Sequence, residues 1–486
     1  MIDTQAIRKK ILDLALRGKL TEQLPEDGTA EEAFLQIQAE QIGESRKNKC
    51  LLPMSEDEVP FEIPNNWQWV RLGCVLDVIS GVSYDKSDVT SNGLRIIRGG
   101  NIQASKIVLD ESDVFLPEKY FDEQKIVRKD DIIIVASTGS STAIGRAGFS
   151  VNDIPDTMIG AFLRICRPKS FVYAHYLHIL FMSDYYNRHI RELSKGTNIN
   201  NVKESYITSF AIPFPPGAEQ HRISEKVKST FSILDTIDAL QSQYQDNLAT
   251  LKSKIIDAGI QGKLTEQLPE DGTAEELYQQ IQQEKLALEK AGKTKKSKPL
   301  PPISDEEKPF DIPESWKWVR FSDLMLTVST GPFGSMLHKS DYLNNGIPLV
   351  NPMNIVDGKI IPSDKMMVSE ESRLRLASYV LHEGMIVMGR RGEMGRCAIV
   401  NKNEDGWLCG TGSFFMEPSN CIHVQYVIVF LSTIYAKTYL GGQSIGMTMS
   451  NLNHTILTKM PVPLPPLAQQ KRIVAKLEEL LPLCEG

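Results

Sequence analysis

The longest regular pattern of apolar positions in the chain follows Pro215-Pro216. Apolar residues recur there at steps of three and four, and neither proline nor glycine occurs from residue 219 to 258. This spacing predicts a helix with one apolar stripe, about 60 Å long at a rise of about 1.5 Å per residue. A stripe on a long helix requires a partner that covers it. Its positions are Ile223, Val227, Phe231, Leu234, Ile237, Leu240, Tyr244, Leu248, Leu251 and Ile255.

An internal repeat supplies that partner. The fifteen residues Gly18–Glu32 recur unchanged at Gly262–Glu276. VPFEIPNNWQWVRL at 59–72 matches KPFDIPESWKWVRF at 308–321, and PPGAEQHRI at 215–223 matches PPLAQQKRI at 465–473. In this register the two chain ends together form a second copy of the long helix. We therefore predict two antiparallel, coiled-coil-like helices with pseudo-two-fold symmetry and neighbouring termini. The apolar residues expected to face the long helix are Ile7, Ile11, Leu14, Ile473, Leu477, Leu480 and Leu481.

A shorter helix and a globular unit are predicted after each rod. Residues 29–32 and 273–276 both read Thr-Ala-Glu-Glu, a capping box that begins a helix. Polar linkers and proline-rich segments then lead into the globular units, where strand-like runs such as Ile132–Val135 occur. The predicted class is α+β (mixed α/β). The predicted divisions are a helical segment at 1–44, a globular domain at 45–217, a helical region at 218–298, a second globular domain at 299–466, and a terminal helix at 467–486.

Composition limits the class of protein. The chain has 486 residues, of which 41% are hydrophobic and 24% charged, which is typical of globular proteins. No apolar run approaches the roughly 18 residues of a membrane helix, and basic residues interrupt Met1–Leu20, so we expect neither a membrane span nor a signal peptide. The seven cysteines include no C-x-x-C pair, which favours reduced thiols and the cytoplasm. A net charge of −7 argues only mildly against DNA binding, because local basic surface decides it.

Sequence signatures of catalysis are missing. No phosphate-binding G-x-x-x-x-G-K-[ST] loop occurs, and neither does the Asn-Pro-Pro-Tyr or Asp-Pro-Pro-Tyr motif of an amino-methyltransferase. His175 and His178 are spaced for a metal pair, but no third ligand is suggested, so no metal site is predicted. Four tryptophans, Trp67, Trp69, Trp316 and Trp318, lie in segments that the two copies share, and we interpret them as core anchors rather than as base-stacking residues.

Three segments in each unit are better candidates for contact with a ligand, and they differ between the copies. They are a glycine-containing loop after the first strand, a strand and loop near residues 136–146 and 389–396, and a small, amide-rich loop before the last strand. Residues 98–102 and 351–355, which share only the asparagine and the isoleucine at their ends, add further candidates. Arginine can bridge guanine, glutamate can accept from cytosine, and asparagine or glutamine can bridge adenine.

The candidates in the first unit are Ser80, Tyr84, Lys86, Arg98, Asn101, Ser137, Thr138, Ser140, Arg146, Lys195, Thr197, Asn198 and Asn201. Those in the second unit are Phe333, Ser335, Lys339, Asn351, Asn354, Arg390, Arg391, Glu393, Arg396, Gln443, Ser444, Thr448 and Asn451.

The order and duplication of these motifs resemble the specificity (S) subunit of type I restriction-modification enzymes. The motifs are P-x-x-W-x-W-V before each unit, T-G-P-F-G-S at 330–335, G-x-x-G-R at 392–396, and P-P-x-x-x-Q-x-x-I at the start of each long helix. The resemblance covers essentially the whole chain. The first unit departs from it, since it has ISGVS at 79–83 in place of T-G-P-F-G-S and three extra residues in its G-x-x-G-R region.

The resemblance implies a division of labour. Each globular unit would be a target-recognition domain that reads one half of a bipartite, asymmetric site in double-stranded DNA, and the helices would set the spacer and carry the partners. Those partners would be two modification subunits, which methylate adenine N6 with S-adenosylmethionine, and restriction subunits, which use ATP and Mg²⁺. The chain itself would bind no cofactor or metal and catalyse nothing.

Three alternatives stay open at this point. The first is a DNA methyltransferase fused to its own recognition domain, against which the missing cofactor motif counts. The second is a scaffold whose two units bind only proteins. The third is the specificity chain of a related system that cuts on both sides of its site, which the sequence does not distinguish.

Overall fold

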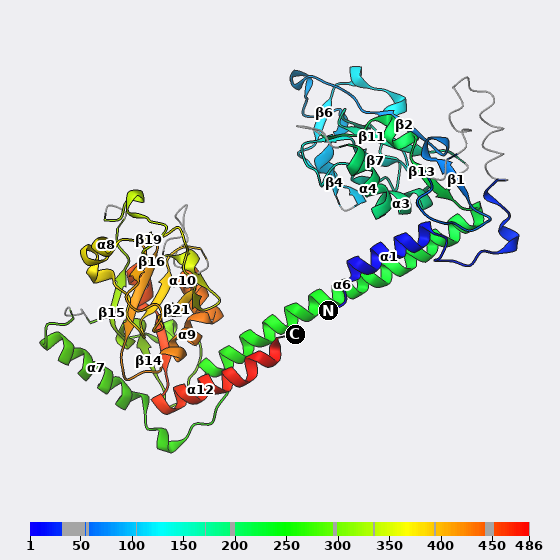
Figure 1. Cartoon of the computed structure of the whole chain (residues 1–486). Coiled ribbons are helices and arrows are strands. Elements are labelled where there is room, and N and C mark those ends of the chain that lie inside the picture. The colour runs from blue at the N-terminus through cyan, green and yellow to red at the C-terminus, as the bar shows by residue number, and fades with distance from the viewer. Residues whose placement is uncertain are drawn as a thin grey trace. The chain divides into compact units, whose positions relative to one another are not determined.

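The computed structural model describes residues 1–31, 54, 58–103, 105–170, 172–194, 200–294, 299–333, 336–392, 395–442 and 452–485. The chain divides into unit 1, Met1–Ser242, and unit 2, Gln243–Gly486. Each unit holds a globular part of mixed helices and strands and a portion of the helix α6, Gly217–Ile260, which has 44 residues (Figure 1). The predicted α+β class and the long central helix are confirmed.

The bounds of α6 follow from the residues at its ends. Pro215 and Pro216 precede it, and Gly262 follows it with φ of +74°, a conformation that glycine adopts without strain. On the stripe, Ile223, Val227 and Leu234 are buried in the core of unit 1. The helix is therefore held by tertiary packing along one face, as the periodicity predicted.

A terminal helix packs antiparallel against α6 in each unit. In unit 1, α1 (Thr4–Leu16) places Arg8 2.8 Å from Asp235, and the backbone N–H of Ile2 donates to the Gln241 side chain. In unit 2, α12 (Leu467–Leu480) packs Ile473 and Leu477 against the helix near Gly259. Figure 1 shows α1 in blue along one part of α6 and α12 in red along another.

The terminal helices leave part of the α6 stripe exposed. Leu240, Tyr244 and Leu251 are 59%, 53% and 46% exposed. Ile2, just before α1, bonds to Gln241. The helix α12 ends at Leu480, and a short 3₁₀ turn, Leu481–Cys484, which contains Pro482, follows it.

The globular part of unit 1 contains two principal sheets. Six strands lie in the order β2-β11-β7-β9-β5-β4, and three in the order β10-β3-β6. Two further pairs, β1-β13 and β12-β8, complete the strands described here. The strand bounds are β1 Gln68–Arg71, β2 Leu76–Ser80, β3 Leu94–Ile97, β4 Ile102–Gln103, β5 Ser105–Ile107, β6 Val114–Leu116, β7 Ile132–Val135, β8 Ser137–Thr138, β9 Ala147–Phe149, β10 Thr157–Ile159, β11 Leu163–Pro168, β12 Asn200–Asn201 and β13 Ala211–Phe214. The helices are α3 Ala174–Met182, α4 Asp184–Leu193 and α5 Glu204–Thr208.

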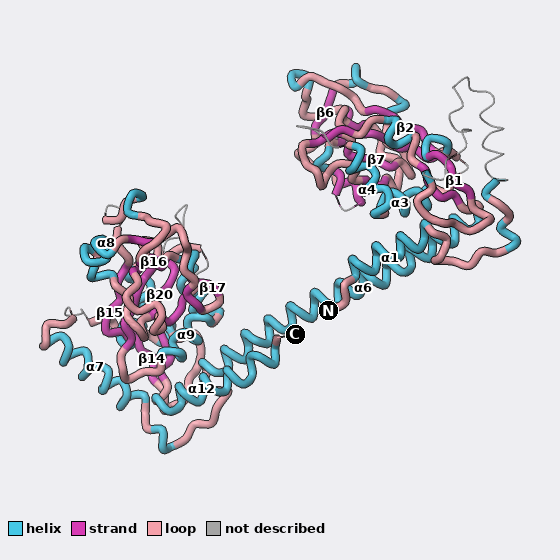
Figure 2. The backbone as a smooth tube through the Cα atoms, in the orientation of Figure 1, coloured by secondary structure: helices cyan, strands magenta, loops and turns pink. Residues whose placement is uncertain are grey.

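Unit 2 repeats this plan although its interior sequence differs. Its sheets run β15-β23-β20-β21 and β19-β16-β22, with the pairs β14-β24 and β17-β18. The strand bounds are β14 Lys317–Arg320, β15 Met325–Thr330, β16 Ile347–Val350, β17 Ile355–Val356, β18 Lys359–Ile360, β19 Met367–Val368, β20 Ile386–Gly389, β21 Cys397–Ile399, β22 Leu408–Cys409, β23 Ser413–Pro418 and β24 Pro461–Leu464. The helices are α7 Ala274–Lys290, α8 Glu370–Arg375, α9 Val424–Ser432, α10 Ile434–Gly442 and α11 His454–Lys459. Figure 2 shows the strands gathered in the globular parts.

Each globular part is joined to its helices through one buried tryptophan. The indole N–H of Trp67 donates to Glu219 at 2.8 Å, and that of Trp316 donates to Gln469 at 2.7 Å. Both tryptophans are 6% exposed. The interpretation of these residues as core anchors is confirmed, because the indoles bond to the first turns of α6 and α12.

A matched ion pair tightens the same junction in each unit. Arg222 of α6 donates to Asp27 at 2.6 Å, and Arg472 of α12 donates to Asp271 at 2.6 Å. The Asp27 side chain is only 2% exposed. The hydrogen bonds from Arg222 hold the pKa of Asp27 below its ordinary value of 3.8.

Substitution of this arginine is therefore expected to loosen the junction. Arg222→Ala would leave a buried carboxylate without its partner and cost about 2 kcal/mol in unfolding free energy. A carboxyl whose pKa is lowered by folding stabilises the fold above its ordinary pKa of 3.8, and this contribution is lost as the pH falls through the folded value. Hydrogen exchange of residues 20–31 would report both the stability lost in Arg222→Ala and the stability lost at low pH in the unaltered chain. Lys10→Ala, at a pair with Asp13 that is 67% and 43% exposed, is the control and should change little.

The other features of the described residues agree with the sequence. Thr273 caps α7 with the predicted box, in which Glu276 bonds back to the Thr273 backbone. Six cysteines are described, and all are free thiols. None of the helices in this described part of the chain has the apolar length that crossing a bilayer requires.

Candidate nucleic-acid interface

In unit 1 the ends of four strands meet at one edge. Val82 lies beside Gly160 in a parallel bridge, and Ile97 pairs with Ile159. Val135 pairs with Leu163 in the neighbouring sheet. The residues that follow β2, β3, β7 and β10 therefore converge, and together with β12 they form what we call the strand-end surface of unit 1 (residues 80–86, 98–101, 136–146, 160–162 and 200–201).

Hydrogen bonds fix these segments to one another. The strands β8 and β12 pair antiparallel, with Asn201 opposite Ser137. The backbone N–H of Val202 donates to the carbonyl of Ala136 at 2.7 Å. Arg146 reaches across to the carbonyl of Gly99 at 3.0 Å. Segments far apart in the sequence, all of them candidates for contact, thus lie together at this edge.

The candidate side chains of this surface differ in accessibility. Five are exposed, four are half-buried, and one, Asn101, is buried. The exposed ones are Ser80, Lys86, Arg98, Ser140 and Asn201, and the half-buried ones are Tyr84, Ser137, Thr138 and Arg146. Two cations, Lys86 and Arg98, are therefore open to an anionic ligand, while Arg146 contributes to the frame of the surface.

Asn101 and its counterpart Asn354 have structural roles. The Asn101 amide donates to the carbonyl of Val108 at 2.9 Å, and the Asn354 amide donates to that of Ile361 at 2.9 Å. The amide oxygen of each accepts a backbone N–H three residues earlier. Both side chains are buried and bonded within their own turns, which favours a structural role over contact with DNA.

Unit 2 builds the corresponding edge with the same backbone bonds. The N–H of Gly331 donates to Ser413, that of Gly410 donates to Val350, and that of Arg390 donates to Gly412, all at 2.9 Å. The N–H of Leu452 donates to the Arg390 carbonyl at 3.0 Å. The strand-end surface of unit 2 is accordingly residues 331–333, 351–354, 390–392 and 410–412.

The two neighbouring arginines of this surface play different parts. The Arg390 side chain is half-buried, donates to the carbonyl of Leu452 at 3.2 Å, and lies 5.1 Å from the ring centroid of Phe414. Burial, with the charge of Arg391 beside it, lowers the pKa of Arg390. Arg391 is exposed. Arg390 thus supports the surface, and Arg391 presents its guanidinium outward.

Sequence comparisons identify what these two units are. Residues 64–244 and 313–484 match the family of the type I restriction modification DNA specificity domain. The chain belongs to this family. Its two matches coincide with the two globular parts and the helices that follow them, so the internal repeat is a pair of specificity domains.

Related proteins agree with the assignment over nearly the full length. The chain is 28% identical to the EcoAI type I restriction enzyme specificity subunit of Escherichia coli, over 98% of this chain and 89% of that protein. It is 26% identical to the EcoEI specificity subunit of Escherichia coli, over 99% and 89%. A solved chain from a study of assembly and conformational transition in a type I R-M system has the same fold, with a TM-score of 0.58 at 20% identity over 87% of this chain and 92% of that one.

The chain is thus a type I specificity subunit with two target-recognition domains and no catalytic role of its own. This confirms the resemblance drawn from the sequence.

The remaining candidates of the specificity subunit are placed as follows. Phe333 is exposed, and Asn351 and Arg396 are half-buried. Lys339 begins a 3₁₀ turn, Lys339–Asp341. The candidates outside the described residues are Lys195, Thr197, Asn198, Ser335, Glu393, Gln443, Ser444, Thr448 and Asn451.

One part of each surface escaped the sequence reasoning. The turns Gly160–Phe162 and Gly410–Gly412 lie at the centre of the backbone network but contain few of the polar residues that mark a contact loop. Their signal was a glycine in the same register of both copies, Gly160 and Gly410, each directly after a strand.

Proposed function

We propose that each strand-end surface reads one half of a bipartite, asymmetric DNA sequence. The observation that carries this proposal is one backbone frame with two different sets of side chains. The edge of unit 1 presents Ser137, Thr138 and Asn201, and that of unit 2 presents Arg391 and Phe333. A common frame with different polar groups suits two domains that read different bases.

Electrostatics supports duplex DNA as the ligand despite the acidic chain. Lys86 and Arg98 are exposed on the surface of unit 1, and Arg391 is exposed on that of unit 2. Cations at these positions can neutralise phosphates locally. Modification subunits would enclose the rest of the duplex.

In this proposal the helices set the distance between the half-sites and bind the modification subunits. At about 1.5 Å per residue, the 44 residues of α6 extend about 66 Å, and this length would set the spacer between the half-sites. Two modification subunits would dock on the helical region and methylate adenine N6 with S-adenosylmethionine. Restriction subunits would supply ATP- and Mg²⁺-dependent cleavage, and the assembly would act in the cytoplasm.

Arg391→Ala in the complex with modification subunits tests the assignment of the surface. A lost arginine contact with a base edge costs about 1–3 kcal/mol, so we expect methylation of the preferred site to fall about tenfold or more and discrimination at the second half-site to relax. Sequencing of methylated adenines in a library with both half-sites randomised would measure this.

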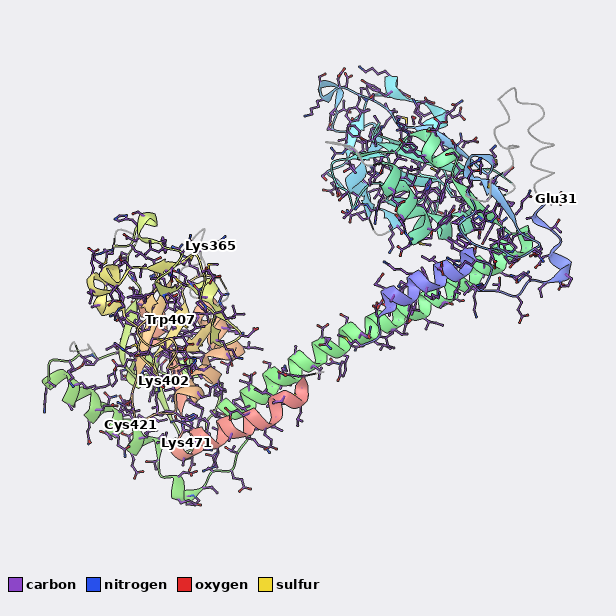
Figure 3. The ribbon with its side chains drawn as sticks, viewed as in Figure 1. Glu31, Lys365, Lys402, Trp407, Cys421 and Lys471 are labelled. Atoms are coloured by element: carbon purple, nitrogen blue, oxygen red, sulfur yellow. The ribbon has the colours of Figure 1, made fainter. Side chains whose placement is uncertain are left out.

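Lys402→Ala is the matched control. Lys402 is exposed in the same unit and follows β21 (Figure 3). The end of β21 at Ile399 pairs with Ile386, which is at the opposite end of β20 from Arg390. We expect it to leave the preferred sequence unchanged. Equal losses on random and preferred DNA after Arg391→Ala would contradict base reading at this position.

A further inference from the structure

The turn Gly160–Phe162 of unit 1 is held on three sides by backbone bonds. The N–H of Gly160 donates to Ile97 at 2.9 Å, and that of Ala161 donates to Val82 at 2.9 Å. The carbonyl of Phe162 accepts from Ala136 at 2.8 Å and from Ser137 at 3.0 Å. The turn therefore connects the loops that follow β2, β3 and β7, and its backbone has little freedom to move.

Two neighbours fix the turn further. Arg164 donates to the carbonyls of Ala161 and Leu163 at 3.1 and 2.9 Å. A Cβ on Gly81 would lie 2.1 Å from the carbonyl oxygen of Gly160, so only glycine permits this approach. The position of Phe162 is thus determined by its surroundings rather than by its own side chain.

The side chain mounted on this rigid turn is an exposed aromatic ring. Phe162 is 69% exposed, more than Phe121, which is 52% exposed in the same unit. A ring that packs so little adds almost nothing to the core. It stands on the strand-end surface together with the exposed side chains of Arg98 and Asn201.

Unit 2 also exposes a phenylalanine on its strand-end surface, but on a different segment of the chain. At the position of Phe162 it has Gly412, whose Cβ would lie 3.0 Å from Pro352, so a side chain there is crowded. Phe333, in the loop after β15, is 68% exposed instead. Residue 83, which corresponds to Phe333 in the repeat, is a serine. Each surface thus has one exposed phenyl ring, carried on a different segment.

We propose that Phe162 is a specificity-determining residue of the first recognition domain, whose ring enters a groove of the DNA and packs against base edges of the first half-site. This inference rests on the proposed function of the strand-end surface and extends it to a residue outside the polar candidates. An apolar ring can contact a thymine methyl group or wedge at a base step. Its rigid mounting avoids an entropic cost of ordering on binding.

The test uses the full chain assembled with its modification subunits. Phe162→Ala is expected to lower affinity for the preferred site about tenfold or more and to relax the first half-site, while the second half-site and binding to random DNA stay unchanged. Phe162→Leu, which remains apolar, should recover part of the preference. Methylated-site sequencing and competition binding with random duplex provide the readouts.

Phe121→Ala is the control. Phe121 is also exposed, but it follows β6, and the last residue of β6 pairs with Leu94, at the opposite end of β3 from Arg98. The proposal is overturned if Phe162→Ala behaves as Phe121→Ala does. It is also overturned if Phe162→Ala weakens subunit assembly, measured by mass photometry, without altering base preference, since the ring would then bind protein. If the strand-end surfaces do not read DNA at all, a separate result shows it: Arg391→Ala would leave the base preference at the second half-site unchanged.

Discussion

Inserting seven helix-forming residues into α6 after Ser242 is expected to make the complex prefer a longer spacer. Seven residues lengthen a helix by about 10 Å and turn it by close to two full turns, so the faces beyond the insertion keep their direction. The insertion lies between Gln241, to which Ile2 is bonded, and Lys252, which pairs with Glu485 after α12. Both of these pairings lie outside the inserted segment.

The size of this effect follows from tethering. Joint engagement of two half-sites raises affinity by a factor of about 10² to 10⁴ when the spacing fits, and the gain disappears when it does not. We expect methylation at the native spacing to fall about 100-fold and activity to appear on sites a few base pairs longer. Substrates whose spacers differ one base pair at a time would measure both.

An insertion that lengthens the chain but not the helix is the control for this prediction. The same seven residues placed after Lys402, in an exposed turn of unit 2, should leave the spacer preference unchanged. If the α6 insertion retained the native spacing, the length of this helix would not set the distance between half-sites.

The sequence predicted the helical framework well because its signals are local. The absence of proline and glycine and the apolar step through Ile223, Val227 and Leu234 define α6 without knowledge of tertiary contacts. The identical flanks likewise placed Trp67 and Trp316 at equivalent junctions. Coverage of the stripe was less predictable, since Leu240 and Leu251 continue the pattern but remain exposed.

The surfaces were harder to predict because their frame consists of backbone bonds. Ala136 donates to Phe162 and Arg390 donates to Gly412 through backbone N–H groups, which every residue except proline supplies. Side-chain type alone therefore marked Asn101 as a contact although its amide is bonded within a turn. A comparison of the copies also points to a structural role, because only this asparagine and the isoleucine after it, Asn101-Ile102 and Asn354-Ile355, are shared between the two segments.

Replacing residues 313–466 by residues 64–216 is expected to convert the asymmetric site into two copies of the first half-site. Both strands of the pair β1-β13 lie within the transplanted segment, so their register moves intact. At the new junction, Gln469 can accept from the Trp67 indole as it does from that of Trp316. Gln470 can accept from the backbone of Tyr173, as Gln220 does in unit 1 at 3.2 Å.

The expected change in specificity is large. Each mismatched base pair costs about 1–3 kcal/mol, so several mismatches in one half-site lower methylation of the native site by well over 100-fold. Because the rods are antiparallel and the repeat predicts pseudo-two-fold symmetry, the two copies should be inverted. Sequencing of methylated adenines from cells that contain the altered chain and the modification subunits would reveal the new site.

The reciprocal replacement, of residues 64–216 by 313–466, is the matched control and should yield two copies of the second half-site. The first altered chain contains two copies of the first recognition domain, and the second contains two copies of the second. Both join these domains to the helices at the same residues. If one exchange yields a symmetric site built from the first half-site and the other yields one built from the second, then each domain reads its own half-site independently. An asymmetric site from either chain would instead mean that bases are read jointly by a domain and its helical surroundings, and the assignment of one half-site to each strand-end surface would be wrong.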